Sequence, residues 1–184
     1  MIEKKINYKI IDNFISNKEL FNIQSLFLDP DITSPIPWYY NAGTTGDYEL
    51  KIKYDVEDYY FCNLFYVDDK PYSKGFKELK TILDKLNCKS LIRVKGNLYP
   101  STSKRYNHPD HIDYSYSHKG AIFYVNTNDG FTVLEDGTEI KSIENRVLLF
   151  DPSTLHHSTT CTDQKVRITI NFNYLIILWF SMIG

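Results

Sequence analysis

The chain has 184 residues, of which 42% are hydrophobic and 24% are charged, and its formal net charge is −2 at pH 7. This length and composition predict one folded domain and exclude an intrinsically disordered protein. Because nucleic acids are bound mainly by lysine and arginine side chains that neutralise phosphates, the slightly negative charge argues against a general nucleic-acid-binding protein.

The cysteines and the chain ends bear on the cellular compartment. Cys62, Cys88 and Cys161 are far apart and form no CxxC pair, which argues against a disulfide framework and is typical of a reducing compartment. The segment MIEKKINYK lacks the apolar stretch of a signal peptide, and the apolar segment 175–182 is shorter than the roughly 20 residues that span a bilayer. We therefore expect a cytoplasmic protein without a membrane segment.

The N-terminal half predicts two amphipathic helices that cover a sheet. The first follows Ser16, which can form a capping box with Glu19, and an Asp-Pro pair ends the apolar repeat behind it. The second covers about residues 73–86, where apolar residues recur at helical spacing opposite lysines. Between them, prolines, glycines and clustered aromatic residues in the segment 30–72 indicate irregular structure with short strands.

From residue 91 onward, short runs of β-branched and aromatic residues alternate with turn signals. A helical front end followed by closely spaced strands predicts a mainly β fold with flanking α-helices. The expected architecture is a β-sandwich or jelly roll with the N-terminal helices packed outside. Residues 1–89 would then support a β core at 90–174 within a single domain, 1–184. The expected strands are 91–99, 121–126, 131–134, 146–150 and 166–173.

The pattern His-x-Asp at residues 111–113 is the first candidate for chemistry. In an extended chain, residues two apart lie on one side, about 6.6 Å apart, so an imidazole and a carboxylate can converge on one metal ion. The motif alone is weak, but His156-His157 follows the expected strand 146–150 and offers a second histidine. Two histidines and one carboxylate on one face of an iron ion leave positions open for a co-substrate and oxygen.

Arg167 is the second candidate, and it lies in the expected strand 166–173. Alternation groups Arg167, Thr169 and Asn171 on one face and places only apolar residues on the other. The apolar face is expected to pack under the helices, so the polar face would line a wet cavity. An unpaired buried charge costs several kcal/mol, and the carboxylate of a ligand could pair with the guanidinium in a bidentate manner. The alternative is an ordinary arginine on a surface strand.

Four segments occur in order along the chain: HID at 111–113, AIFYVNTNDGFTVLEDG at 121–137, ENRVLLFD at 144–151 and HHSTTCTDQKVRITINFNY at 156–174. Together they resemble the core of the Fe(II)/2-oxoglutarate-dependent oxygenase superfamily, most closely its prolyl-4-hydroxylase-like branch of small bacterial and phage proteins. The resemblance covers about residues 90–174, and its specificity lies in the order and spacing of the segments. It implies a double-stranded β-helix (jelly roll), an Fe(II) site, 2-oxoglutarate as co-substrate, and O₂.

The resemblance also implies which residues hold the metal. His111, Asp113 and His156 match the iron ligands, which are the catalytic centre of the family. In the family an arginine follows the distal histidine after about ten residues, and His156 fits that interval better than His157. His157 remains the alternative distal ligand.

For the co-substrate, the resemblance and the alternation along 166–173 together indicate a set of five residues. Arg167 and Tyr124 match the pair that binds the far carboxylate of 2-oxoglutarate. Tyr99, in a Tyr-Pro pair before the first metal ligand, matches a tyrosine that faces the co-substrate. Thr169 and Asn171 would line the same site, although the family often has a hydroxyl residue at the position of Asn171. Each tyrosine could instead be an ordinary core aromatic residue.

Two further histidines compete as metal ligands. The segment His108-Pro109-Asp110 repeats the His-x-Asp pattern, but its proline disfavours a regular strand, and His118 has no carboxylate two residues later. Both histidines are expected in the loop beside the mouth of the site, near Tyr114 and Tyr116. There they would either contact the substrate or be exposed to solvent.

The implied reaction is hydroxylation of a peptidyl side chain, prolyl first, or of a small molecule, with release of succinate and CO₂. Repair of alkylated nucleic acid is a competing interpretation, because Lys104 and Arg105 could contact a phosphate and nearby tyrosines could stack on a base. Relatives that demethylate bases carry a second arginine six residues after the first, and that position is Asn173 here. We therefore expect a peptide, protein or small-molecule substrate rather than nucleic acid.

Two other classes of protein could use similar residues. A cupin-like metal-binding protein or isomerase would share the barrel and the histidines, but it would not need Arg167 for a dicarboxylate. A zinc hydrolase could use two histidines and one aspartate with an activated water. Succinate production separates an oxygenase from the first class, and hydrolysis that does not need oxygen would identify the second.

Overall fold

The computed structural model describes residues 6–28, 36–43 and 57–176. All its strand pairs are antiparallel and form two sheets. In chain order the elements are β1 (Lys9–Ile11), α1 (Asn17–Leu28), β2 (Tyr39–Asn41), β3 (Tyr60–Val67), β4 (Lys70–Pro71), the 3₁₀ helix η2 (Lys74–Leu79), α2 (Lys80–Lys85), β5 (Ser90–Pro100), β6 (Lys119–Tyr124), β7 (Phe131–Leu134), β8 (Glu139–Lys141), β9 (Arg146–Phe150), β10 (His156–Ser158) and β11 (Val166–Leu175).

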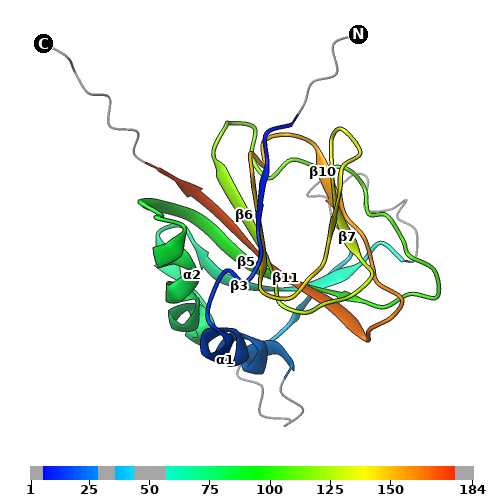
Figure 1. Ribbon diagram of the computed structural model, residues 1–184, viewed down its shortest axis with the longest axis horizontal. Helices are drawn as coiled ribbons and strands as arrows, with labels where there is room; N and C mark the ends of the chain where they lie inside the picture. The colour runs from blue at the N-terminus through cyan, green and yellow to red at the C-terminus, as the bar shows by residue number, and fades with distance from the viewer. Residues whose placement is uncertain (1–5, 29–35, 44–56, 177–184) are drawn as a thin grey trace, which may run out of the picture.

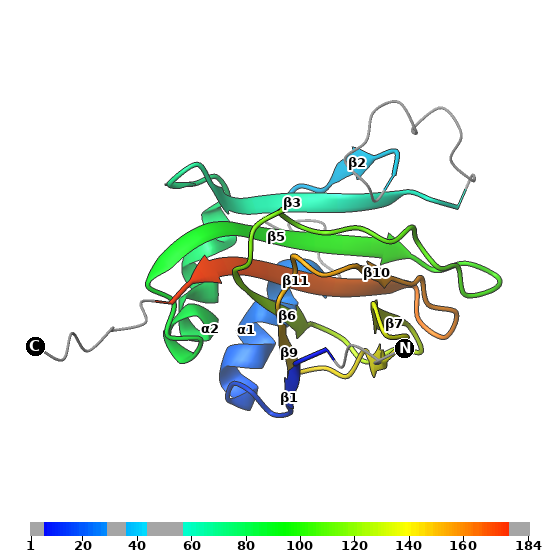
Figure 2. The same ribbon diagram turned by 90° about the horizontal axis from the view of Figure 1, so that it is seen from above.

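The two sheets face each other as a β-sandwich of the jelly-roll kind (Figure 1). The larger sheet has the order β1-β9-β6-β11-β5-β3-β2, with β4 paired to β3, and the smaller sheet has the order β10-β7-β8. Seen from above, the long strands β3, β5 and β11 run side by side (Figure 2), and Figure 1 shows the helices on one side of these strands and β10 on the other. The five strands predicted after residue 90 correspond to β5, β6, β7, β9 and β11.

The helix α1 begins as the capping box predicts. The backbone N–H of Ser16 donates to Glu19 Oε2 at 2.8 Å, and the N–H of Glu19 donates to Ser16 Oγ at 3.4 Å. The second oxygen of Glu19 accepts a hydrogen bond from Thr81 Oγ1 at 2.5 Å, which ties the start of α1 to α2. The predicted stop at the Asp-Pro pair, 29–30, lies outside the described residues.

The prediction of one continuous helix over 73–86 was wrong in part. The segment begins as the 3₁₀ helix η2, capped by Ser73, and becomes α-helical only at α2. Gly75 lies in η2, and a Cβ added there would come within 2.9 Å of Ile36 Cδ1. Glycine is about 1 kcal/mol less favourable than alanine in an α-helix, so a close approach that requires glycine also weakens the α-helical alternative.

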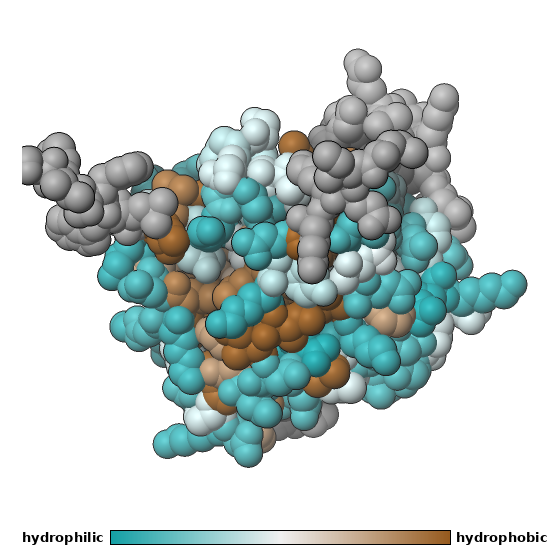
Figure 3. Space-filling view, turned by 45° about the horizontal axis from the view of Figure 1, so that its top comes forward, coloured by the Kyte–Doolittle hydropathy of each residue, from teal (hydrophilic) through white to brown (hydrophobic). Residues whose placement is uncertain are grey.

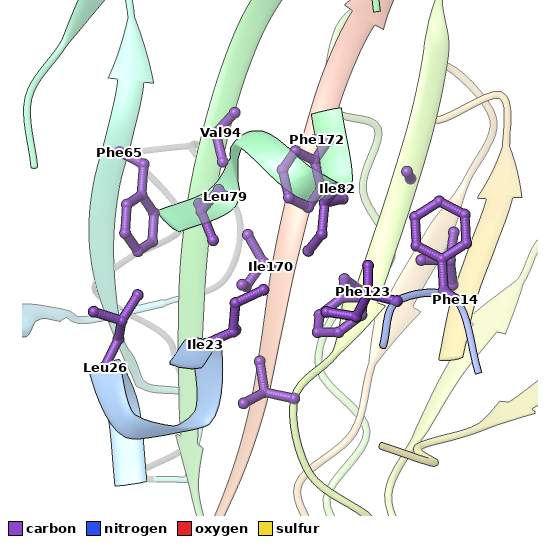
Figure 4. Close-up of a cluster of buried hydrophobic side chains, with 14 of the residues drawn as sticks. Phe14, Ile23, Leu26, Phe65, Leu79, Ile82, Val94, Phe123, Ile170 and Phe172 are labelled. Carbon is purple, nitrogen blue, oxygen red and sulfur yellow. The ribbon is translucent and has the colours of Figure 1, made fainter. Parts of the chain in front are cut away.

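The main apolar core lies between the helices and the larger sheet (Figures 1 and 4). Ile23 of α1 and Ile82 of α2 belong to the same buried cluster as three apolar residues of β11, namely Ile168, Ile170 and Phe172. Burial of a side chain of this kind contributes roughly 1.5–3 kcal/mol. The side chains on the outward face of β11 are therefore held by apolar packing, which adds to the pairing with β5 and β6 and fixes the position of the polar residues on the other face.

Where it is described, the segment 30–72 contains one strand longer than the sequence suggested. Residues 60–67 form the eight-residue strand β3, which pairs with β5 inside the larger sheet. Its aromatic residues, which the sequence analysis took as a sign of irregular structure, are typical of strands. The structure also adds β8 and β10, each of three residues. Strands this short show no periodicity and form only because β7 lies between them.

On the face shown in Figure 3, the largest group of apolar residues lies near the centre, and hydrophilic residues cover most of the area around it. Large apolar side chains that are exposed include Phe21 of α1 and Tyr39 and Tyr40 of β2. Within the described ranges, every helix is too short or too polar to cross a membrane.

Candidate metal centre and co-substrate cavity

The polar residues of the site are arranged along the inward face of β11. Because β11 lies between β5 and β6, its residues pair with both neighbours and form rungs across the sheet. We call the rung that contains Arg167 the arginine end, and the rung that contains Asn173 the carboxylate end. In order, the rungs are Arg167–Tyr99, Asn97–Thr169–Tyr124, Lys95–Asn171–Ile122 and Arg93–Asn173–Gly120.

His111, Asp113 and His156 come together beside the carboxylate end. Their candidate ligand atoms all lie within 4.8 Å of one another. Backbone hydrogen bonds create this proximity: His111 and His156 exchange two N–H···O bonds of 3.0 Å, and the N–H of Asp113 donates to Pro152 O at 2.9 Å. The loop that carries the HID motif is thus fastened to the start of β10, and the three side chains could hold a metal ion.

The two histidines have the neutral protonation state that metal binding requires. Nδ1 of His156 lies 3.0 Å from the carbonyl oxygen of Thr154 and donates to it, so Nε2 keeps its lone pair, and Nε2 is buried without a protein partner. Histidines that bind a metal through one ring nitrogen typically donate the N–H of the other nitrogen to a carbonyl oxygen or a carboxylate in this way. Burial lowers the pKa of His156, and burial together with the nearby His156 lowers the pKa of His111 to about 4. Both imidazoles are therefore neutral near pH 7.

Asp113 is held in a fixed orientation by two donors. Its Oδ1 accepts from Arg93 Nη2 at 2.7 Å, and its Oδ2 accepts from Asn173 Nδ2 at 2.8 Å. Burial by itself would raise the pKa of Asp113, but the charge of Arg93 and the hydrogen bond from Asn173 outweigh it and lower the pKa to about 2. The group beside the histidines is therefore an ionised carboxylate.

At the arginine end, Arg167 is fully buried, with 0% of its surface exposed. Its Nε donates to Ser142 Oγ at 2.8 Å and its Nη2 donates to Thr132 Oγ1 at 3.1 Å, while Nη1 has no partner. The carboxylates of the described residues form no ion pair with it. A buried cation in this state needs an anion that the described chain does not supply.

One cavity extends from His111 and His156 to Arg167. Four of the five predicted co-substrate residues line it: Tyr99, Arg167, Thr169 and Asn171. Tyr124 lies behind that wall, and its hydroxyl donates to Thr132 Oγ1 at 2.9 Å. In full, the cavity is lined by Tyr60, Lys95, Asn97, Tyr99, His111, Ile122, Thr132, His156, His157, Ser158, Arg167, Thr169 and Asn171.

Of the two adjacent histidines, His156 is the one that joins His111 and Asp113. The ring of His157 also borders the cavity, but its Nδ1 lies 2.6 Å from Asp110 Oδ1. Because side chains alternate along a strand, a shift of one residue in β10 would exchange the two rings.

His108 and His118 do not join the metal-capable group, and neither is exposed to solvent. His108 is 2% exposed, with Nδ1 at 2.9 Å from Ser158 O and its ring 5.0 Å from that of Tyr99. His118 is 4% exposed, and its Nε2 lies 3.0 Å from Asn173 Nδ2. The solvent-exposed alternative is therefore wrong for both, because each ring fills space behind a residue of the site.

Several residues of the site escaped the sequence analysis. Alternation along 91–99 places Arg93 and Lys95 on the same face as Tyr99, so two cations inside a strand were a signal that could have been used. Thr132 and Ser142, which hold Arg167, carried no such signal because ordinary hydroxyl residues are common near turns.

The two sheets form a fold that is also found in solved structures of 2-oxoglutarate- and Fe(II)-dependent oxygenases and prolyl hydroxylases. The chain is similar to a prolyl hydroxylase from Trichoplax adhaerens in complex with a hypoxia inducible factor peptide fragment (TM-score 0.59, 13% identity, 91% of this chain and 83% of that chain). It is also similar to a Pseudomonas putida prolyl-4-hydroxylase (TM-score 0.58, 11% identity, 94% of each chain). A third similar structure is an oxidoreductase of the 2OG-Fe(II) oxygenase family from Burkholderia pseudomallei (TM-score 0.58, 9% identity, 91% of this chain and 85% of that chain).

Sequence comparison finds no such relatives. No protein-family model matches the chain, and no curated protein matches it. The resemblance that four short segments indicated is nevertheless confirmed by these structural neighbours. At identities this low, the likeness establishes the fold.

Proposed function

We propose that this protein is an Fe(II)- and 2-oxoglutarate-dependent dioxygenase that hydroxylates its substrate. The observation that carries the proposal is Arg167, a fully buried guanidinium with an unpartnered Nη1 and no paired carboxylate among the described residues. It lines a cavity whose other end is bordered by His111 and His156. A dicarboxylate that reaches from a metal ion to Arg167 would satisfy both ends, and 2-oxoglutarate is such a molecule.

The residues present fit an Fe(II) ion. Two neutral imidazoles, from His111 and His156, and the ionised carboxylate of Asp113 are the donor set that suits non-haem iron with open positions. When bound, iron would supply the oxygen chemistry in which O₂ converts 2-oxoglutarate to succinate and CO₂ and the second oxygen atom enters a substrate C–H bond. Arg93 keeps Asp113 ionised and oriented, and Thr154 keeps Nε2 of His156 free.

The double-stranded β-helix core at 90–174 would hold the co-substrate. Arg167 would donate to the far carboxylate through Nη1, while Ser142 and Thr132 fix its plane. Tyr124 would act through Thr132 rather than by direct contact, because its hydroxyl is already bonded there. The ring of Tyr99, 5.3 Å from the guanidinium carbon, would keep water away from the pair.

A peptidyl substrate, with a prolyl residue first, is the leading proposal, and a small molecule is the alternative. One structural neighbour is a prolyl hydroxylase in complex with a peptide. The contacts of two side chains weigh against nucleic acid. Asn173 is engaged with Asp113 and His118, and Arg105 donates to the carbonyl oxygen of Asp129 at 3.0 Å, so neither side chain is set apart for a phosphate.

The test is succinate formation from 2-oxoglutarate in the presence of Fe(II) and O₂. Arg167→Met should raise the 2-oxoglutarate concentration needed for half-maximal turnover by at least about tenfold, the scale of one charge-assisted pair. Arg146→Met is the matched control, because that guanidinium pairs with Asp12 at the sheet edge, 2.6 Å from Nε to Oδ1. Turnover without O₂, or an equal 2-oxoglutarate requirement in both variants, would contradict the proposal.

The substrate class is tested by the same assay. Proline-containing peptides, free amino acids and methylated single-stranded DNA are compared for their ability to stimulate succinate formation. Peptides are expected to stimulate it most. Stimulation by the DNA alone would overturn the substrate assignment and leave the oxygenase chemistry intact.

A further inference from the structure

Lys95 places a second positive charge inside the cavity. Its side chain projects from β5 into the space that His111 and Arg167 also line. Its Nζ donates to the hydroxyl of Tyr60 at 3.3 Å and lies 5.3 Å from the centre of that ring. Within the described part of the chain, this hydroxyl is the sole hydrogen-bond partner of the ammonium, and no carboxylate forms an ion pair with it.

The position of Lys95 lies between the two ends of the site. It pairs with Asn171, one rung away from the Arg93–Asn173 rung that holds Asp113. It is four residues from Tyr99 along β5, and Tyr99 pairs with Arg167. The ammonium is directed toward that end of the strand, because the hydroxyl that it contacts belongs to Tyr60, whose ring stacks on that of Tyr99 at 5.7 Å. A ligand that extends from the metal centre to Arg167 therefore runs past the rung of Lys95.

The residues on the neighbouring rung positions are polar, and some of their atoms lack hydrogen-bond partners. Asn97 is 1% exposed, and its Oδ1 has no partner in the protein; the Oδ1 of Asn171 is buried and also unpartnered. Burial, followed by the charge of Arg93, lowers the pKa of Lys95. A group held in this way is stabilised when an anion binds beside it.

The balance of charges indicates which anion is missing. The negative charge of Asp113 is already paired with Arg93. Two cations of the cavity, Lys95 and Arg167, remain without a carboxylate from the described residues. 2-Oxoglutarate carries two carboxylates, one at each end.

We infer that Lys95 binds the 1-carboxylate of 2-oxoglutarate, next to the 2-oxo group, while Arg167 binds the far carboxylate. This inference rests on the proposed function. A lysine suits this place because its ammonium is a compact charge that can contact a carboxylate whose other oxygen is directed at a metal. A carboxylate of the substrate that is hydroxylated could pair with Lys95 in the same way. The rung of Lys95, however, lies between the metal centre and Arg167, where the co-substrate would bind.

The test measures binding rather than turnover. Protein loaded with Mn²⁺ is titrated in a calorimeter, without O₂, with 2-oxoglutarate and with 2-oxopentanoate, which keeps the 1-carboxylate but lacks the far one. Lys95→Met should weaken the binding of both ligands by about tenfold, and Lys95→Arg should keep most of the affinity. Lys141→Met, on the exposed strand position of β8, is the matched control and should change neither.

Each outcome decides the inference. Arg167→Met should weaken binding of 2-oxoglutarate but not of 2-oxopentanoate, the opposite selectivity. If Lys95→Met leaves the affinity for 2-oxoglutarate unchanged, the inference is overturned, whereas the proposed function survives as long as Arg167→Met loses affinity. If Lys95→Met weakens 2-oxoglutarate alone, Lys95 acts at the far carboxylate and the inference is again overturned.

Two controls keep that result interpretable. Mn²⁺ affinity is measured for each variant, because a change there would alter ligand binding indirectly. Should Lys95→Met lower the unfolding temperature, Lys95→Gln removes the charge while keeping a polar group, and the same tenfold loss is expected. A wild-type protein that binds Mn²⁺ but not 2-oxoglutarate would overturn the inference and the proposed function together.

Discussion

The two faces of β11 are almost equally buried, but they differ in whether their side chains find interaction partners within the chain. On the outward face, Ile168, Ile170 and Phe172 are at most 1% exposed and pack within one apolar cluster. On the inward face, Arg167 is just as buried, yet it keeps a guanidinium nitrogen without a partner. Burial alone therefore does not separate stability from function. What separates them is whether the buried groups find their partners within the chain.

This difference has an energetic consequence. An apolar side chain contributes by leaving water, so its stabilisation is complete once the chain has folded. A buried ion that lacks a partner costs free energy, and that cost is recovered only when a ligand binds. Mutations on the outward face should therefore change stability, and mutations on the inward side should change ligand and metal binding.

The largest effect is expected at the metal centre on the inward side. His111→Ala, Asp113→Ala and His156→Ala should each abolish Fe(II)-dependent succinate formation and bound iron, because each removes one of three ligands. His157→Ala is the matched control and should keep much of both, since the Nδ1 of that ring is bonded to Asp110. Iron analysis of the purified variants decides this. Loss of iron in His157→Ala together with retention in His156→Ala would show that the register is shifted by one residue.

A large but different effect is expected on the outward face. Phe172→Ala should lower the free energy of unfolding by about 3–5 kcal/mol, the usual cost of a cavity at a buried phenylalanine. The affinity of the folded protein for 2-oxoglutarate should stay within about twofold of the wild type. Urea unfolding and calorimetry provide the two readouts. A loss of 2-oxoglutarate affinity as large as that of Arg167→Met would show that the two faces are coupled.

A smaller effect is expected from pH. Burial lowers the pKa of His108 to about 3, whereas an unfolded histidine has a pKa of about 6.5. As pH falls below about 6.5, the unfolded state takes up a proton first, so stability is lost on the way down toward pH 3. Between pH 7.5 and pH 5 this histidine should account for about 2 kcal/mol of that loss.

The variant that tests this is His108→Gln in the metal-free protein. His111 also has a depressed pKa, about 4, but it contributes to the wild type and to the variant alike. Urea unfolding at several pH values should therefore give a shallower pH dependence in His108→Gln, by about 2 kcal/mol over that interval. Parallel curves would mean that His108 can be protonated in the folded state.

The sequence by itself determined the parts that depend on local spacing. Alternation identified the two faces of β11, the Ser16–Glu19 pair marked the start of α1, and the HID motif placed an imidazole and a carboxylate on one side of the chain. The order of four short segments was enough to indicate the fold that the structural neighbours share. In each case the information lies within a few residues, or in intervals along the chain.

Only the tertiary structure decided which residues from distant segments meet. It brought His156, and not His157, beside His111 and Asp113. The sequence could not decide this, because β10 is three residues long and its register depends on β7. The tertiary structure bonded the hydroxyl of Tyr124 to Thr132. It also brought Arg93 of β5 into contact with Asp113, which lies in the loop before β6. The physical reason is that periodicity tells which face a residue occupies, whereas contacts across a cavity depend on how the sheets pair and pack.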